Sequence, residues 1–508
     1  MIRRISIEKQ TDYFKRQIFF VFFLTVLLTV CLVHKGQGYT MEPSEIKPIV
    51  YFERYLAEPG TPLKAETYGY MLGEKLTYSW ETGCGKLETT GDCYIPDEGD
   101  LEQFITVTVS SEFHEDQTAR VYCSRLPVLY LNIENGETVD SRETGKAAEL
   151  VLQGAGETAG YQYEGMAEVS GRGNTSWEEV KRPYKIKLLE KEGLLGMDRS
   201  KKWVLLANYN NPSLMRNKLL FDLAADMGIA APESFWVDLI VNGEYAGNYQ
   251  LTEHIDFETV IGLKEGLLLE LDEYYDEEVK FRSSKGQPVM LHEPIDSDRA
   301  GKAVSVAEQF VNAFELAIDS PDFSTEYLGR QTRYSDLFDM DSLAGYWVVN
   351  ELFYNCDFMR KSAWFYIDPL GKAFMGPVWD NDWSSGNPPC EDWDRWSTLW
   401  FDVEAQKDNW YRSLIKDPAF RKKAREIYWE YRERIGEIVA EDGIINKDYW
   451  LLYEAALSND RLWKYGDGYE ADVTLLRDWL TNRIEWLDRQ FATEESLAES
   501  LLSAEMGR

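Results

Sequence analysis

Histidine, paired cysteines and basic residues are scarce in this chain of 508 residues. Four His occur and no Cys-x-x-Cys is present, so the usual ligand spacing of a zinc site is missing. Lys and Arg number 54 against 88 Asp and Glu, which gives a formal net charge of −34. A surface this negative repels phosphate backbones, and we therefore expect no nucleic-acid partner.

One continuous apolar run stands near the N-terminus. Five basic residues within positions 1–17 precede Ile18–Val33, a run of 16 residues. A positive segment followed by an apolar one is typical of a secretory signal or a signal anchor. The run is slightly short for a membrane span, and both cleavage near Gly36-Gln37-Gly38 and retention as an anchor remain open. We expect residues 1–40 to direct export and to make the only membrane contact, so that the protein is extracytoplasmic, either secreted or anchored to the cell membrane.

Short alternating segments separated by turns follow in residues 41–125. This pattern of short strands and turns predicts a small all-β sandwich of immunoglobulin-like type. Cys84, Cys93 and Cys123 lie in it. In an oxidising compartment Cys84 and Cys93 could close a loop, but the sequence does not choose the pairing. The clearest predicted strands are Lys75–Trp80, Phe104–Ser110 and Ala119–Cys123.

Residues 126–491 mix strands and helices, which predicts an α+β domain with a helical C-terminal part. Asn242-Gly243 between two alternating runs is a strong hairpin signal. A helix is predicted over Ser213–Met227, with Ser213 as its cap. Residues 492–508 are expected to be a frayed tail. The later predicted helices are Val304–Ser320, Ser342–Asn355 capped by Asp341, a long helix from Asp417-Pro418 to about Val439, and Ala471–Phe491.

Three acids flank a second predicted hairpin. Its strands are Ala363–Ile367 and Lys372–Trp379, joined by an Asp-Pro-Leu-Gly turn that fits type I. Asp357 precedes the first strand, whereas Asp380 and Asp382 leave the second. Because a hairpin brings its open ends together, we expect these carboxylates on one side of a cleft. Carboxylates that lie close together repel one another, so they are stabilised by a divalent metal or a shared proton.

A simpler interpretation is that these acids cap turns and bind nothing, since Asp favours turns. Three acids on one hairpin beside Trp364, Trp379 and Trp383 make that interpretation less attractive. A second acidic stretch, 272–278, is read as a solvated loop in preference to a metal site.

The stretch G-P-V-W-D-N-D-W-S-S-G-N, which ends at Asn387, resembles the W-D-x-D signature of the CotH kinase family, the spore-coat protein H type of atypical protein kinase. The resemblance extends from about Leu126 to Phe491. The other blocks that carry it are Gly171–Trp177, Lys181–Leu188, Lys201–Asn208, Leu214–Leu219, Val241–Ile255 and Leu267–Glu273.

This resemblance implies a bilobal protein-kinase-like domain that transfers the γ-phosphoryl group of ATP to Ser or Thr of exported or surface proteins. ATP and Mg²⁺ are the implied cofactors, with Mn²⁺ as an alternative to Mg²⁺. Asp357 would accept or orient the hydroxyl proton, Asp380 would hold the metal, and Asp382 would assist. Neither an H-R-D nor a D-F-G sequence is present, and Ser362 stands where ordinary kinases have the Asn that binds a second metal.

The nucleotide is expected on the Gly171–Trp177 loop and the strand Tyr184–Leu188 that follows it. Lys185 and Lys187 share one face of that strand, and the matching family block favours Lys187 as the phosphate ligand. The helix after this strand offers no Glu to pair with the lysine. The remaining predicted nucleotide-binding residues are Arg172, Asn174, Arg216 and Glu253.

A function of a different class remains open. A non-catalytic surface adhesin or envelope scaffold with a kinase-like fold would suit the N-terminal anchor, the sandwich and the many aromatic residues. A glycoside hydrolase with paired carboxylates is a third, more distant alternative. Incubation with labelled ATP and Mg²⁺ discriminates best, because an adhesin shows neither autophosphorylation nor turnover.

Overall fold

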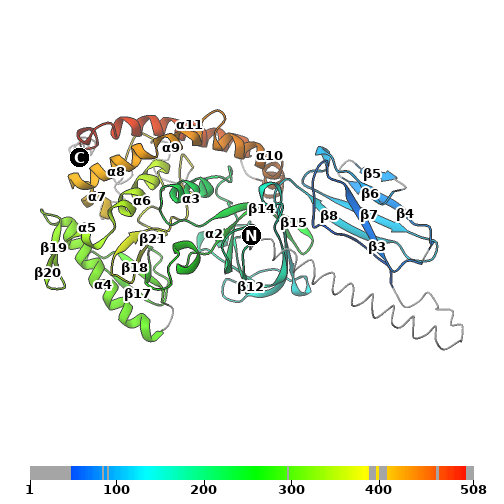
Figure 1. Ribbon diagram of the computed structural model, residues 1–508, viewed down its shortest axis with the longest axis horizontal. Coiled ribbons are helices and arrows are strands. Elements are labelled where there is room, and N and C mark those ends of the chain that lie inside the picture. The colour runs from blue at the N-terminus through cyan, green and yellow to red at the C-terminus, as the bar shows by residue number, and fades with distance from the viewer. Residues whose placement is uncertain are drawn as a thin grey trace, which may run out of the picture.

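The protein has three successive parts, which Figure 1 shows as N-terminal β-sheets, a closed β-barrel and a largely helical C-terminal part. The structure is a computed structural model that describes residues 47–71, 73–82, 85–88, 91–294, 297–387, 396–399, 409–464 and 468–498. The predicted N-terminal segment 1–40, Cys84 and the last part of the predicted tail lie outside these residues. Among the helices of the described ranges, none combines the length and apolar character that a membrane crossing requires.

The N-terminal part contains two sheets around one core. Trp80, Ile105, Val107 and Val109 are buried there, because alternate residues of β7 face inward. Cys93 is exposed and Cys123 is buried, and both are free thiols. One sheet has the order β1 (Ile49–Phe52), β3 (Leu63–Tyr68), β6 (Cys93–Tyr94), and the other the order β2 (Leu56–Ala57), β8 (Gln117–Cys123), β7 (Gln103–Ser110), β4 (Thr77–Thr82), β5 (Gly85–Glu88).

Seven strands then close into a barrel, which the sequence did not predict. Closure depends on the pairing of β14 with β9, the barrel's one parallel pair among the described residues. Along β12, Ile186 and Leu188 are buried, whereas Lys185 and Lys187 are exposed on the opposite face. In barrel order the strands are β10 (Lys146–Gln153), β11 (Gln162–Gly171), β12 (Tyr184–Glu192), β13 (Ser200–Leu206), β15 (Glu244–Glu253), β14 (Ser234–Val241) and β9 (Val128–Ile133).

The C-terminal part combines a second sheet with helices. The sheet has the order β17 (Lys280–Arg282), β18 (Pro288–Glu293), β16 (Leu267–Leu271), β21 (Ala363–Ile367), β22 (Ala373–Met375), and β19 (Ser324–Tyr327) pairs with β20 (Arg330–Arg333). Its helices are α4 (Ser297–Asp319), α5 (Tyr334–Leu337), α6 (Met340–Phe353), α7 (Trp410–Leu414), α8 (Pro418–Glu430), α9 (Arg432–Val439), α10 (Ile444–Trp463) and α11 (Gly468–Gln490). Two further helices, α2 (Thr175–Glu178) and α3 (Arg216–Asp226), lie between barrel strands in the sequence. Short turns of helix lie at Glu98–Asp100, Glu134–Gly136, Gly156–Thr158 and Phe257–Ile261.

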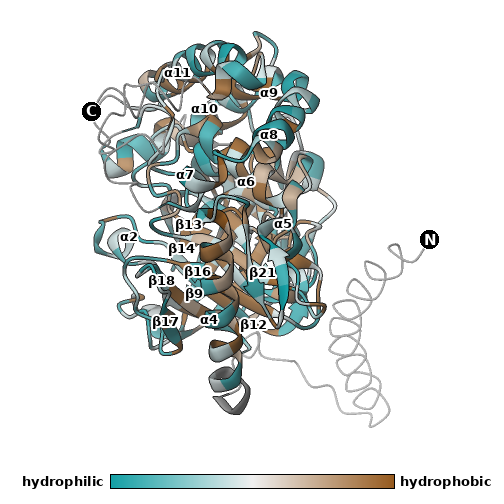
Figure 2. Cartoon of the chain, turned by 90° about the vertical axis from the view of Figure 1, so that its left-hand side faces the viewer, coloured by the Kyte–Doolittle hydropathy of each residue, from teal (hydrophilic) through white to brown (hydrophobic). Residues whose placement is uncertain are grey.

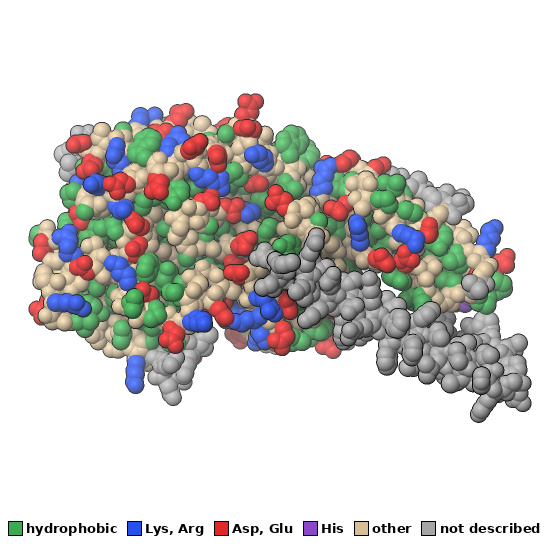
Figure 3. All heavy atoms as spheres, viewed as in Figure 1, with side chains coloured by type: hydrophobic (Ala, Val, Ile, Leu, Met, Phe, Trp, Pro, Cys, Tyr) green, Lys and Arg blue, Asp and Glu red, His purple; other side chains and the backbone are tan. Residues whose placement is uncertain are grey.

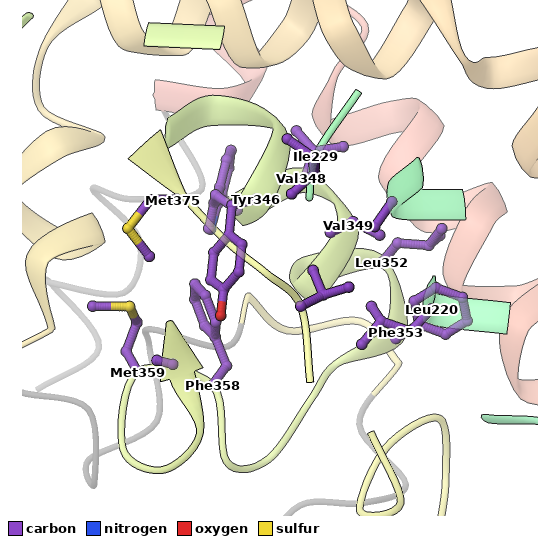
Figure 4. Packing of buried hydrophobic residues seen from close by; sticks show 14 of the residues in the cluster. Leu220, Ile229, Tyr346, Val348, Val349, Leu352, Phe353, Phe358, Met359 and Met375 are labelled. Atoms are coloured by element: carbon purple, nitrogen blue, oxygen red, sulfur yellow. The ribbon is translucent and has the colours of Figure 1, made fainter. Parts of the chain in front are cut away.

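Helix α6 lies at the centre of this part. Every residue from Ser342 to Phe353 is buried, as expected for a helix that is apolar all round. Figure 2 shows α6 as largely hydrophobic, whereas α8 and α9 present hydrophilic surface. In Figure 4, Phe353 lies beside Leu220 of α3 and Tyr346 beside Phe358, with ring centroids 5.8 Å apart in the second pair. The core therefore fixes the segment that follows α6.

Several predicted element boundaries need correction. Helix α3 begins at Arg216 rather than after a Ser213 cap, and the side chain of Ser213 instead contacts Arg216. The cap of α6 is Asp339, whose carboxylate accepts from the backbone of Ser342 at 2.8 Å, and not Asp341. The predicted helix to Val439 is divided at Tyr431 into α8 and α9, while Asp417 caps α8 as predicted.

Candidate functional site

The segment after α6 carries Asp357 into a tight turn. The helix ends with Tyr354 in the left-handed conformation, and the backbone N–H groups of Arg360 and Lys361 both donate to Asp357 O at 2.9 Å. Asn355 Oδ1 accepts from Asp357 N at 3.0 Å, and Asn355 Nδ2 donates to Asp380 O at 3.1 Å. One asparagine side chain thus joins the two acid-bearing segments.

The β21–β22 hairpin forms as predicted and delivers the other two acids. Phe365 pairs with Met375 and Ile367 with Ala373, although the second strand ends before the predicted Trp379. Asp380 and Asp382 follow it and are partly buried. The hairpin therefore brings its flanking segments together, since Cys356 N donates to Trp383 O at 2.9 Å, and the charge of Asp357 raises the pKa values of Asp380 and Asp382.

Helix α3 holds the loop that contains these acids. Asn217 Nδ2 donates to Asp382 Oδ1 at 2.8 Å, and Asn217 Oδ1 accepts from Asn381 N at 2.7 Å. Asn381 Nδ2 in turn donates to the carbonyl of Arg216 at 2.8 Å. The first turn of α3 therefore holds Asn381 and the side chain of Asp382.

Left-handed backbone conformations at residues other than glycine gather in this segment. Such conformations cost about 1–3 kcal/mol each and cluster at active sites and ligand clamps. A concentration of them around the acids indicates a segment shaped for function. The residues concerned are Tyr354, Met359, Ser362, Asp380 and Ser385.

Burial and mutual repulsion raise the pKa values of the acids. Burial, then the neighbouring Asp382 and Asp357, raise the pKa of Asp380 to about 8, against the opposing effect of Arg172. Burial is also the main cause that raises the pKa of Asp382 to about 6. For Asp357 burial raises the pKa, while Lys361 and Arg360 act in the opposite direction. Neither Asp380 nor Asp382 forms an ion pair with any of the described residues.

A fourth carboxylate, Asp272, joins these three to form what we call the acid cluster. Asp272 follows β16 and is 6% exposed. It accepts from Tyr274 N at 2.8 Å and from Ser362 N at 3.2 Å, and burial followed by Glu270 raises its pKa to about 7. The interpretation of 272–278 as a solvated loop did not identify Asp272. The pattern that could have identified it is an acid placed directly after a buried strand.

Arg172 and Asn174 lie on the loop after β11, as predicted for a nucleotide loop. The Arg172 guanidinium lies 5.0 Å from the centroid of the Trp379 ring. Because Trp379 directly precedes Asp380, this contact places the cation beside the acid cluster. Burial lowers the Arg172 pKa, while Asp380 and Glu270 raise it. Asn174 accepts from Arg142 at 2.6 Å and donates to Asp276 at 3.3 Å.

Among the other predicted nucleotide-binding residues, Arg216 acts on the acid cluster, because its charge opposes the effect of burial on the pKa of Asp382. Lys185 and Lys187 are exposed on the outer face of β12. Glu253 accepts from Glu233 N at 2.9 Å, and burial raises its pKa to about 7. Arg216 is fully buried and directs its guanidinium to Asp472 at 2.5 Å and to Ser384 O at 3.1 Å. In this structure Arg216 therefore braces the loop after β22 against α11.

The donor set of the acid cluster suits a hard divalent cation. Mg²⁺ prefers carboxylate and carbonyl oxygens and usually keeps several waters beside one or two protein carboxylates. Asp380 and Asp382 offer such oxygens without a competing ion pair in the described chain. Within the same ranges no group of three or more His, Cys, Asp or Glu side chains has the arrangement of a metal site. Any cation here would depend on fewer protein carboxylates, of which Asp380 and Asp382 are the candidates.

Comparison with known proteins identifies the family of the chain. The family model described as CotH kinase protein matches residues 169–487, which include the loop after β11, the acid cluster and most of α11. None of the curated proteins compared with the chain matches it. The match covers more than half of the chain, and the protein therefore belongs to the CotH kinase protein family.

Proposed function

We propose that this protein is an atypical protein kinase that transfers the γ-phosphoryl group of ATP to a Ser or Thr hydroxyl. Family membership implies a phosphotransferase that uses ATP. The observation that carries the proposal is the pairing of Asp357 with Asp380 through Asn355 at the open end of the β21–β22 hairpin. Phosphoryl transfer depends mainly on positioning and charge neutralisation, which a few fixed acids and one cation supply.

Asp357 is the proposed general base. Its carboxylate is 15% exposed, and Lys361 and Arg360 favour its charged form while burial raises its pKa. A base that is partly desolvated but still ionised accepts a hydroxyl proton more readily than a free aspartate does. The turn fixed by Arg360 N and Lys361 N holds its backbone in place.

Asp380 and Asp382 are the proposed metal ligands. A bound Mg²⁺, or Mn²⁺ in its place, would neutralise charge on the phosphates. Asn217 fixes Asp382, and Asn355 fixes the backbone of Asp380. Arg172, beside Asp380 and the Trp379 ring, is the proposed phosphate-binding cation, and Asn174 positions the loop that carries it.

The wider setting is also proposed. The barrel and the helical part would form the two lobes of a kinase-like body, with the acid cluster beside the loop after β11. Segment Ile18–Val33 would export the chain, so that its substrates are secreted or surface proteins. The expectation that nucleic acid is not a partner rests on the net charge of −34. Acidic and basic side chains are interspersed over the face in Figure 3. A reporter fused after Arg125 should be active outside the cytoplasm.

The test is nucleotide binding beside phosphotransfer with the full chain. Calorimetry should show ATP binding that requires Mg²⁺ and is abolished by a chelator. Incubation with γ-labelled ATP and casein or another Ser-rich protein should label the acceptor or the protein itself. A folded protein that neither binds ATP nor transfers phosphate would favour the adhesin or scaffold alternative.

A further inference from the structure

A lysine stands beside the proposed base. Lys361 Nζ lies 3.9 Å from Asp357 Oδ1 and 3.3 Å from Glu273 Oε1, and 5.0 Å from the centroid of the Tyr274 ring. Its side chain is 24% exposed. Because its own N–H donates to Asp357 O, the i,i+4 turn places both side chains on one side of the segment.

We propose that Lys361 is a further catalytic residue, whose ammonium contacts the phosphoryl group during its transfer to the acceptor at Asp357. The inference rests on the proposed kinase function. In the step, a lone pair of the acceptor oxygen forms the new O–P bond, and the bond from the γ-phosphorus to the β–γ bridging oxygen breaks. That electron pair leaves with ADP, and the acceptor proton passes to Asp357. The equatorial phosphoryl oxygens carry charge that a nearby ammonium stabilises.

Three other cations that the sequence marks for the nucleotide take different positions. Arg172 stands with Asp380 and the Trp379 ring, on the nucleotide side of the acid cluster. Arg216 is buried against Asp472, and Lys187 is exposed on the barrel. Lys361 is the cation that reaches within 4 Å of the Asp357 carboxylate among the described residues.

The neighbours of Lys361 position its ammonium and leave it able to move toward a phosphoryl group. Glu273 is shared with Arg360, whose guanidinium approaches both of its carboxylate oxygens at 3.4 Å. Glu273 therefore keeps a cationic partner when Lys361 turns toward the phosphoryl group. The Tyr274 ring supports the ammonium by a cation–π contact, and Thr175 fixes Tyr274 through a 2.7 Å contact between the two hydroxyls.

Arg360 is a matched control. It adjoins Lys361, carries the same charge and pairs with the same Glu273, but its side chain makes no hydrogen bond or ion pair with Asp357 in the described structure. Arg360→Met and Lys361→Met therefore remove equal charge from the same loop, and only the second removes the contact beside the base. Lys361→Arg keeps the charge and serves as the conservative variant.

The experiment compares these variants by three measurements. Lys361→Met should lower kcat on the order of 10²-fold, as for removal of one transition-state donor, whereas Lys361→Arg should recover much of the rate. Calorimetric affinity for Mg²⁺-ATP should change by less than about twofold, and affinity for ADP with aluminium fluoride should fall by roughly the factor lost in kcat. The acidic limb of the kcat profile should move to higher pH, since Lys361 lowers the pKa of Asp357. Arg360→Met removes a charge that also favours the ionised form of Asp357, but no contact beside the base. It should therefore move the acidic limb in the same direction, lose less than about tenfold in kcat and keep the ratio of the two affinities of the parent.

Two results would overturn the inference. One is an equal loss of kcat for Lys361→Met and Arg360→Met, and the other is an equal fall, for Lys361→Met, in the affinities for Mg²⁺-ATP and for ADP with aluminium fluoride. A parent protein that binds no nucleotide would instead overturn the proposed function itself. If Lys361→Met lowers the melting temperature, Lys361→Gln repeats the comparison with a side chain that keeps polar contact with Glu273.

Discussion

Asn217 of α3 donates a 2.8 Å hydrogen bond to the carboxylate of Asp382, which lies 165 residues further along the chain. The carbonyl oxygen of the same amide accepts from Asn381 N at 2.7 Å. Both ends of one side chain are therefore used to hold the W-D-N-D loop. A helix outside the hairpin thus determines where a proposed metal ligand stands.

Substitution of Asn217 by Ala should weaken nucleotide binding without removing any acid. A hydrogen bond to a charged group contributes about 1.5–3 kcal/mol, so Mg²⁺-ATP affinity should fall roughly ten- to a hundred-fold. Calorimetry measures the loss. Lys218→Ala is the control, because Lys218 belongs to the same helix but pairs with Asp222 at 2.8 Å. Equal Mg²⁺-ATP affinities for the two variants would contradict the proposed role of Asn217 in positioning Asp382.

The β21–β22 hairpin shows what the sequence could predict. Its alternation and its Asp-Pro-Leu-Gly turn are local signals, and they led correctly to acids at its open end. The partners of those acids depend on distant segments. Ser362 meets Asp272, 90 residues away, and no periodicity connects them.

The lysines of β12 show why a local sequence pattern could not predict which residues lie at the site. Alternation separated Lys185 and Lys187 from Ile186 and Leu188 correctly. It did not say that seven strands would close into a barrel with the aliphatic residues inside and the lysines outside, because closure requires β9 to pair with β14 about a hundred residues later. The resemblance to the family marked the loop with Arg172 as well, and the structure brings that residue to the acid cluster.

Arg172→Ala should therefore reduce ATP affinity more than Lys187→Ala does. The position of Lys187 on the strand after the loop alone would favour the reverse order. Arg172 stands beside Asp380 at the proposed phosphate site, so its loss should reduce ATP affinity about ten-fold or more, the effect of a lost charged hydrogen bond. Lys187 is exposed, and its loss should change the affinity by less than about twofold. Calorimetric titration of both variants decides the ranking. A larger loss for Lys187→Ala would return the phosphate site to β12.

The raised pKa of Asp380 predicts how stability depends on pH. Its pKa is about 8 in the folded protein against an ordinary value of 3.8. Folding therefore favours the protonated acid, and this stabilisation is complete below pH 4 and lost as the pH rises to about 8. Asp380→Asn, which stays neutral, should match the parent near pH 4 and become progressively more stable than it up to pH 8.

Melting temperatures in the presence of a chelator test this prediction. The chelator keeps divalent cations from restoring the charged form of the parent. Asp222→Asn, which removes a half-exposed acid paired with Lys218 on α3, is the control and should bring no gain in stability at pH 8. Parallel melting curves for the parent and Asp380→Asn across this range would mean that Asp380 is not buried among like charges.

The most direct test separates the two acids that flank the hairpin, by nucleotide titration beside phosphotransfer for Asp357→Asn and Asp380→Asn. Asp357→Asn should keep nearly the parent affinity for Mg²⁺-ATP and lower phosphoryl transfer roughly 10²–10⁴-fold, because only the base is lost. Asp380→Asn should lower both the metal-dependent affinity and the rate, because a charge that the cation needs is gone. Folded variants that both bind and transfer like the parent would contradict the account and leave these acids as turn residues.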